Sequence, residues 1–269
     1  AAGRLVARTL EAMGKALAEF NRGAALLEQY EYPKAAAAFE RALEIVPDWT
    51  AARYNLALAY FNMQEKEKEG QPGSGSLDKA KAIYEDILRK HPDHLHARFS
   101  LGMYYQYVGQ NEEALTAYEK VHQADPDDVY AAYKYAETLT SVGKIPEAIA
   151  VLEKLVAQDP GFVSSHYRLF SLYQRTGQRE KAQGVMQRFK ELSDAELDGK
   201  MFTIGQPYGS AGKYYMALGP DGLPSPAGAA ETTEKDKNGP QAAARLLFSP
   251  DVQKLDAPLK AWKWEGGAV

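Results

Sequence analysis

The 269-residue sequence contains no cysteine. This absence excludes disulfides, thiolate metal sites, covalently attached haem and a cysteine nucleophile. No apolar run reaches the length of about 18 residues that a membrane-spanning helix needs. The sequence also has fewer basic than acidic residues. Its 32 Lys and Arg and 36 Asp and Glu give a net charge of −4. A general nucleic-acid binder needs a basic face, so the composition argues against that class of protein.

Motifs of catalysis and cofactor binding are missing as well. The sequence has no G-x-S-x-G elbow, phosphate loop, dinucleotide fingerprint or H-E-x-x-H pair. Three histidines cluster at His91, His94 and His96. They fall on an expected turn between helices, where their spacing sets no fixed ligand geometry. We therefore predict no metal, no cofactor and no enzymatic activity.

Cellular location is only slightly indicated by the sequence. A chain without cysteine suits an exported bacterial protein. The start Ala1-Ala2-Gly3 resembles the end left by cleavage at a small-residue site, and an arbitrary boundary would look the same. These features favour a periplasmic or extracellular location and leave a cytoplasmic one open.

A repeat of constant length runs through most of the chain. Its clearest marker is the alanine that opens the second helix of each unit: Ala35, Ala80, Ala114, Ala148 and Ala182. From Ala80 onward these alanines recur every 34 residues, and the first interval is longer by an 11-residue insertion. A proline that ends the second helix follows most of them: Pro47, Pro92, Pro126 and Pro160.

Further positions keep the same phase. A small residue lies in the middle of each first helix except the last, where Phe170 replaces it: Gly23, Ala57, Gly102 and Ala136. A large apolar side chain follows each marker alanine by four residues, on the same helical face: Phe39, Tyr84, Tyr118, Leu152 and Met186. We expect the small residues to let two helix backbones approach closely.

This pattern resembles the tetratricopeptide-repeat (TPR) family. The resemblance covers residues 16–193, in five units at 16–49, 50–94, 95–128, 129–162 and 163–193. It implies an all-α fold of antiparallel helix pairs stacked into a right-handed superhelix. It also implies a concave face that is lined by the first helix of each pair and usually holds a peptide.

The remaining segments set the domain boundaries. Residues 1–15 continue an apolar stripe and are predicted either to extend the first helix or to form a capping helix bent near Gly14. The solenoid is assigned to 16–194. Its insertion, at 64–76, is predicted to extend one helix with charged residues and then to form a loop. This insertion is either a tolerated surface loop or a contact for a partner.

The tail at 195–269 is rich in Gly and Pro. Short alternating stretches suggest β-segments at 200–204, 213–218, 245–249 and 259–264, with a turn at 219–222. The tail resembles the segment that joins TPR units to an FG-GAP β-propeller in secreted bacterial proteins, although no propeller follows. Its aromatic side chains are candidates for docking it on the solenoid or on another copy: Tyr214, Tyr215, Trp262 and Trp264.

The TPR register predicts the residues of the concave groove. The fifth position of each first helix is aromatic, at Phe20, Tyr54, Phe99, Tyr133 and Tyr167. Such a ladder can stack on an extended chain, or it can simply pack between repeats. Other predicted groove residues are Asn21, Asn55, Tyr130, Lys134, Arg168 and Arg175.

Two functions fit these features. The first is a non-catalytic scaffold whose concave groove binds an extended protein or peptide segment. The second is a self-assembling structural subunit, in an oligomer or an extracellular filament, whose tail docks on a neighbouring copy. A tail that fills its own groove is a third arrangement.

Overall fold

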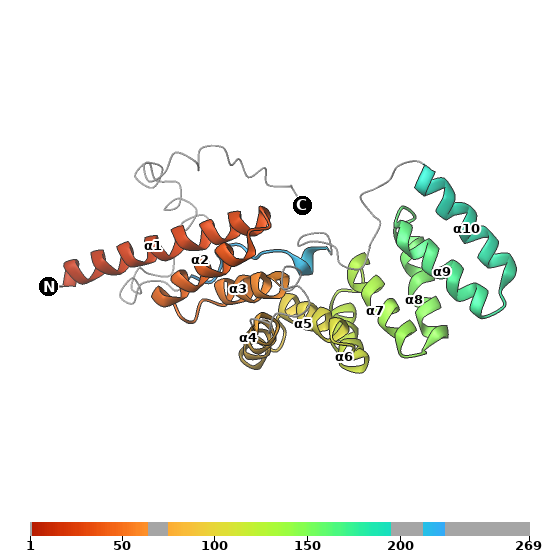
Figure 1. Cartoon of the computed structure of the whole chain (residues 1–269), viewed down its shortest axis with the longest axis horizontal. Helices are drawn as coiled ribbons and strands as arrows, with labels where there is room; N and C mark the ends of the chain where they lie inside the picture. The colour runs from red at the N-terminus through yellow and green to blue at the C-terminus, as the bar shows by residue number, and fades with distance from the viewer. Residues whose placement is uncertain (1, 64–74, 195–211, 224–269) are drawn as a thin grey trace, which may run out of the picture. The chain divides into compact units, whose positions relative to one another are not determined.

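The computed structural model of the chain describes residues 2–63, 75–194 and 212–223. These residues contain α-helices and one 3-10 turn, with no strand among them (Figure 1). The α-helices are α1 (Ala2–Glu28), α2 (Tyr32–Ile45), α3 (Thr50–Met63), α4 (Ser76–Lys90), α5 (Leu95–Tyr107), α6 (Asn111–Ala124), α7 (Val129–Ser141), α8 (Ile145–Gln158), α9 (Val163–Arg175) and α10 (Arg179–Asp194). The described part of the chain therefore has the all-α architecture that the repeat predicts.

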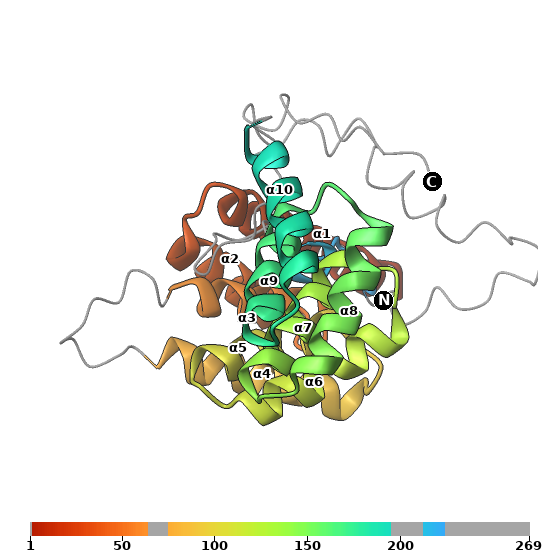
Figure 2. The same cartoon turned by 90° about the vertical axis from the view of Figure 1, so that its right-hand side faces the viewer.

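Helices that follow one another in the chain pack against one another. Every neighbouring pair from α1–α2 to α9–α10 is in contact, and α1 and α5 each also reach α3. Figure 2 looks from the α10 end and shows α9 and α10 in front of the earlier pairs. This pattern of nearest-neighbour contact is that of stacked helix hairpins.

The marker alanines lie at the centre of each hairpin. Ala35, Ala80, Ala114 and Ala148 are completely buried. Ala182, in the last hairpin, is 2% exposed. Each one therefore faces a filled interior, where a larger side chain would have no room.

At two of the small positions of the first helices, the structure shows which side chain lies against the small residue. A Cβ atom on Gly23 would lie 2.8 Å from the ring of Phe39. One on Gly102 would lie 2.9 Å from the ring of Tyr118. In these two repeats the glycine therefore makes room for the aromatic ring four residues after the marker alanine.

Helix ends follow the predicted punctuation. Residues Val46, His91, Asp125 and Asp159 cap the second helices, and a repeat proline comes directly after each of them. Where the first helices begin, the side chains of His94 and Asp128 accept hydrogen bonds from backbone N–H groups three residues on, at 3.1 and 2.7 Å. These bonds satisfy donors that a helix start leaves unpaired.

The N-terminal residues belong to one long helix. α1 runs without interruption from Ala2 to Glu28, and Gly14 lies within it on the exposed side. The helical extension predicted for the insertion lies outside the described residues, because α3 ends at Met63 and the description resumes at Gly75.

One described piece of the tail, at 212–223, packs on the helices. Lys213–Tyr215 form a single 3-10 turn (η3) in place of the β-segment expected at 213–218. The predicted turn at 219–222 is present, with Gly222 at φ +72°. A strand needs a sheet edge to pair with. Among the described residues, this segment meets helices and the turns between them, whose side chains bond to its backbone groups instead. The other predicted β-segments lie outside the described residues.

Candidate interaction groove

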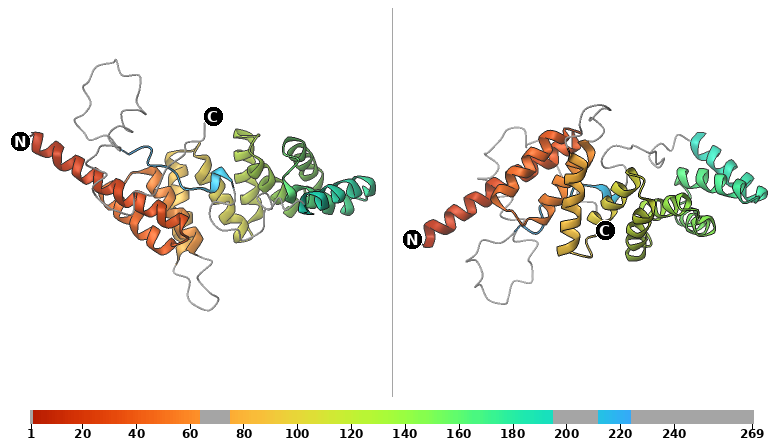
Figure 3. Two further views of the ribbon diagram at one scale, coloured as in Figure 1. Left: turned by 90° about the horizontal axis from the view of Figure 1, so that it is seen from above. Right: turned by 60° about the horizontal axis from the view of Figure 1, so that its bottom comes forward.

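The segment 212–223 lies along the first helices of the solenoid. It begins beside the start of α7, where Lys213 pairs with Asp125 and Asp128. It ends beside Trp49, just before α3. Figure 3 shows this segment in blue alongside α3 and α5. The segment therefore runs backwards along the stack of repeats, and we refer to the residues that touch it as the groove.

The groove holds the main chain of the segment through side-chain hydrogen bonds. The Asn55 amide donates to the carbonyl oxygen of Leu218 at 2.9 Å and accepts from the Leu218 N–H at 2.8 Å. The Tyr54 hydroxyl donates to the carbonyl oxygen of Tyr214 at 3.1 Å. The Trp49 indole N–H donates to the carbonyl oxygen of Asp221 at 3.0 Å. These contacts are spaced along the segment and hold its main chain without reading its sequence.

Two adjacent tyrosines anchor the segment. Tyr214 is 6% exposed and Tyr215 is 2% exposed. Tyr214 donates its hydroxyl hydrogen to Asp125 Oδ2 at 2.6 Å. Tyr215 donates to Asn62 Oδ1 at 2.9 Å. Both side chains are thus buried with their polar ends satisfied.

Aromatic rings surround the anchors. The Tyr214 ring meets His96 at a centroid distance of 5.2 Å and Phe99 at 6.1 Å. The Tyr215 ring meets Phe61 edge-on at 6.1 Å. Such arrangements add to the burial of apolar area, which is the main stabilising contribution of a docked tyrosine.

Burial in the groove shifts the titration of several groups. Desolvation raises the pKa of Tyr54, against a smaller lowering by its hydrogen bond to Ser100. Desolvation, together with the charges of His94 and Lys213, lowers the pKa of His96 to about 4. The hydrogen bonds from Lys213 and Tyr214 hold the pKa of Asp125 below its ordinary value. Docking therefore depends on a neutral His96 and an ionised Asp125.

The predicted groove residues fall into three groups, the first of which contacts the segment. Tyr54, Asn55 and Phe99 touch it as described above. Tyr130 lies against its first residue, because a Cβ atom on Gly212 would come within 2.6 Å of the Tyr130 ring. Gly212 also has φ +82°, a conformation that favours glycine.

The second group has one member in the protein interior and three on the exposed surface. Phe20 is 1% exposed and stacks on Trp49 with centroids 4.4 Å apart, so it supports the groove from below. Asn21, Tyr167 and Arg175 are exposed. Tyr167 contacts the ring of Phe189 at 5.4 Å. In the aromatic ladder, Phe20 therefore packs within the first repeat, and Tyr54 and Phe99 contact the segment.

The third group forms a buried charge cluster on α7 and α9. Glu137, 5% exposed, accepts from Lys134 at 2.9 Å and from Arg168 at 2.6 Å. Gln106 donates to the same carboxylate at 2.8 Å. Arg168 also donates to the Tyr133 hydroxyl at 3.3 Å. The nearby cations lower the pKa of Glu137, although its burial opposes them.

Sequence reasoning missed several residues of the groove: Trp49, Asn62, His96 and Asp125. Asn62 carried a signal, because it is a polar side chain inside the apolar run at 56–63. Asp125 did not stand out among the acidic residues near the repeat prolines. Of the predicted tail anchors, Tyr214 and Tyr215 are described above, and Trp262 and Trp264 lie outside the described residues.

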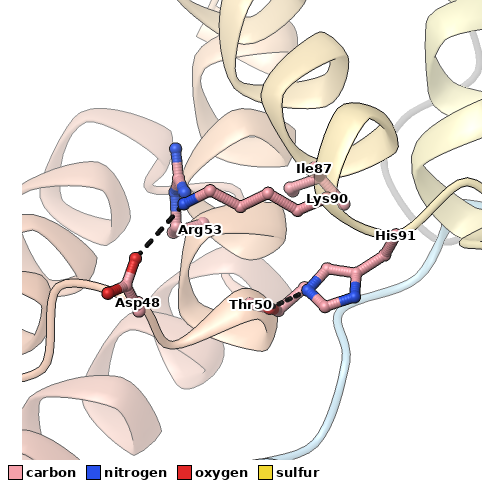
Figure 4. Close-up of a pocket in the computed structure, with 6 residues that line it drawn as sticks. All are labelled: Asp48, Thr50, Arg53, Ile87, Lys90 and His91. Atoms are coloured by element: carbon pink, nitrogen blue, oxygen red, sulfur yellow. Dashed lines mark hydrogen bonds and ion pairs between the residues drawn. The ribbon is translucent and has the colours of Figure 1, made fainter.

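A pocket of about 320 Å³ opens beside the turn between the first two repeats (Figure 4). It is lined by Asp48, Thr50, Arg53, Ile87, Lys90 and His91. Lys90 pairs with Asp48 at 3.2 Å and Arg53 pairs with Asp86. Because aspartates neutralise both of these cations, the pocket lacks the excess charge of an anion site.

The clustered histidines have structural partners. His94 caps α5, His91 shares a hydrogen bond of 3.3 Å with Thr50, and His96 lies against Tyr54 and Tyr214. Within 2–63, 75–194 and 212–223, no group of three or more acidic or histidine side chains is placed to hold a metal ion. No helix in these ranges is long and apolar enough to cross a membrane.

Comparison with known proteins identifies the repeat. Tetratricopeptide-repeat families match residues 16–49, 51–94 and 108–162. These matches all lie before residue 163, so the resemblance of the tail to an FG-GAP linker stays a prediction. Among curated proteins, none has a sequence significantly similar to this chain.

Solved structures share the fold at low sequence identity. "MamA 41-end from Desulfovibrio magneticus RS-1" superposes with a TM-score of 0.59 at 19% identity, covering 68% of this chain and 97% of that one. "MamA MSR-1 C2" gives 0.55 at 19% identity, covering 67% and 98%. YrrB, described as a TPR protein with an unusual peptide-binding site, gives 0.54 at 22% identity, covering 68% and 90%.

Proposed function

Because the chain is a tetratricopeptide-repeat protein, we propose that it is a non-catalytic interaction scaffold that binds an extended protein segment in its concave groove. The observation that carries the proposal is the paired hydrogen bond between the Asn55 amide and the main chain of Leu218. One buried amide satisfies both backbone groups of a residue that belongs to no regular element. An extended peptide offers these same two groups at any residue other than proline.

The remainder of the groove would take the rest of a partner. Tyr133, Lys134 and Arg168 continue along α7 and α9 beyond the point where the described segment begins. Lys134 and Arg168 together carry one positive charge more than Glu137 neutralises. We propose that this part favours an acidic or carboxyl-bearing stretch of the partner.

A second function is favoured by the identity of the occupant. The segment in the groove is part of this chain, so the same contacts would form with the tail of a second copy. Exchange of tails between copies would make the protein a self-assembling subunit. The measurement that distinguishes this function from the first is the molar mass across a concentration series.

The test of the scaffold uses the full chain with Tyr214→Ala and Tyr215→Ala, which removes both anchors of the segment. A fluorescently labelled peptide of residues 212–223 should bind this variant saturably in an anisotropy titration. It should bind the unaltered chain at least about tenfold more weakly, because the segment of that chain competes for the groove.

A matched pair of asparagines provides the control. Adding Asn55→Ala should weaken peptide binding by about tenfold, since two hydrogen bonds are lost and Leu218 keeps its desolvated backbone groups. Adding Asn21→Ala, on the exposed side of α1, should leave the affinity unchanged. Equal affinities for the two variants would place peptide binding elsewhere and refute the groove.

A further inference from the structure

We infer that the groove selects its partner by two adjacent tyrosines whose hydroxyl groups are unmodified. This inference rests on the proposed function and names the chemistry of the partner: a polypeptide segment that carries Tyr-Tyr in the place of Tyr214 and Tyr215. The main-chain contacts accept many sequences. Discrimination between partners therefore has to come from the two sites that hold the side chains of Tyr214 and Tyr215, which we call sockets.

The socket of Tyr215 has a fixed polarity. Asn62 is 3% exposed, and its Nδ2 donates to the carbonyl oxygen of Leu58 at 2.7 Å. Its Oδ1 is therefore turned towards the incoming hydroxyl and needs a donor. A phenylalanine would fill the same space with no donor and would leave this buried oxygen without its hydrogen bond.

The socket of Tyr214 also requires a hydroxyl donor. Its acceptor is the Asp125 carboxylate, which Lys213 holds in the ionised form through a contact of 2.5 Å. A bond from a neutral donor to an ionised acceptor is among the stronger hydrogen bonds in proteins. A phosphate or sulfate on this hydroxyl would remove the donor and bring negative charge against Asp125 and Asp128.

Neighbouring positions add weaker requirements. A cation one residue before the pair meets Asp125 and Asp128, as Lys213 does. The residue three positions after the pair has to keep its N–H for Asn55, which excludes proline there. The residue directly after the pair faces outward, since Met216 is 44% exposed, and any side chain is acceptable.

The experiment measures the affinity of a set of peptides for the full chain with Tyr214→Ala and Tyr215→Ala. Each peptide spans 212–223 and carries one change: Tyr214→Phe, Tyr215→Phe, a phosphate on either tyrosine, or Met216→Ala. Each peptide with phenylalanine should bind about tenfold more weakly than the native peptide. Each phosphorylated peptide should bind about a hundredfold more weakly than the native peptide, or weaker still. The peptide with Met216→Ala should match the native one.

A change in the groove should reverse the preference at one socket. With Asn62→Leu added to the full-chain receptor, the acceptor is gone, and the peptide with Tyr215→Phe should bind more tightly than the native peptide. The circular dichroism spectrum and melting temperature establish that each receptor is folded. If the receptor with Asn62→Leu fails to fold, the peptide series on the receptor that keeps Asn62 still decides the inference.

The outcomes separate the inference from the function beneath it. Saturable binding of all peptides with equal affinity overturns the tyrosine rule and leaves the scaffold intact. Absence of binding by every peptide, native included, overturns both. Binding that depends on the two hydroxyls and reverses with Asn62→Leu establishes the rule.

Discussion

At the scale of single residues, Gly23 shows how little space the repeat leaves. Its position in α1 faces the ring of Phe39, and an added Cβ would lie 2.8 Å from that ring. Gly14 lies in the same helix, and apart from the neighbouring backbone of that helix no atom lies within 4 Å of its added Cβ. The two glycines thus form a matched pair in which packing differs and helix propensity is the same.

We expect Gly23→Ala to lower the free energy of unfolding by about 1–3 kcal/mol, because the Phe39 ring has to move within a filled interior. Gly14→Ala should raise it by about 0.5–1 kcal/mol, since alanine is the better helix former at an exposed site. Urea denaturation followed by circular dichroism measures both. A Gly23→Ala protein as stable as Gly14→Ala would contradict the role assigned to the close ring contact.

Residue patterns predicted the hairpins well and the groove only partly. The marker alanines and repeat prolines depend on local helix crossings and helix ends, which repeat every 34 residues and can be read from one chain. Tyr54, Asn55 and Phe99 followed from the same register. Asp125 and Trp49 gain their roles from residues 89 and 172 positions away, and no periodic pattern records a contact of that length.

At the scale of elements, the segment 212–223 shows the limit of local propensity. Its alternating residues 213–218 favour a strand, but the helices that it meets offer side chains and no strand edge. The backbone bonds to Tyr54 and Asn55 replace the missing ladder. Its attachment to the groove is therefore governed by a small number of polar groups, some of which titrate.

We expect docking of this segment to weaken as the pH falls from 7.5 to 5. When the segment is docked, His96 has a pKa of about 4, below the ordinary histidine value near 6.5. Protonation of His96 below pH 6.5 therefore favours the undocked state. The stability that neutral His96 gives the docked state is fully present above pH 6.5 and is lost as the pH falls towards 4. Since His96 is partly exposed, we expect the equilibrium constant for docking to fall by about tenfold at most between pH 7.5 and 5.

Hydrogen exchange at the Leu218 amide measures this loss, with rates corrected for the intrinsic effect of pH. The groups facing His96 are His94, Tyr54, Tyr214 and Lys213. The pKa of Asp125 is below its ordinary value, so this carboxyl group does not account for a change between pH 7.5 and 5. His96→Gln should abolish the pH dependence, and its persistence in that variant would assign it to another group.

At the scale of the whole chain, the tail decides between the two proposed functions. The segment follows the fifth repeat in sequence yet contacts the first three repeats and the start of α7. Seventeen residues, 195–211, connect it to α10. A segment tethered to its own groove competes with external segments at an effective concentration of the order of millimolar.

We therefore expect the full chain to be a monomer between about 1 and 100 µM, because docking within the chain outcompetes docking between copies at these concentrations. Light scattering coupled to size-exclusion chromatography measures the molar mass, to be compared with 29.7 kDa for one chain. The variant with Tyr214→Ala and Tyr215→Ala is the control, because it lacks both anchors for docking of either kind. A mass that grows with concentration for the unaltered chain, and stays monomeric for the variant, would show that tails dock between copies. The scaffold would then be secondary to self-assembly, and the heterologous contact of a tail with the next groove would extend the assembly copy by copy.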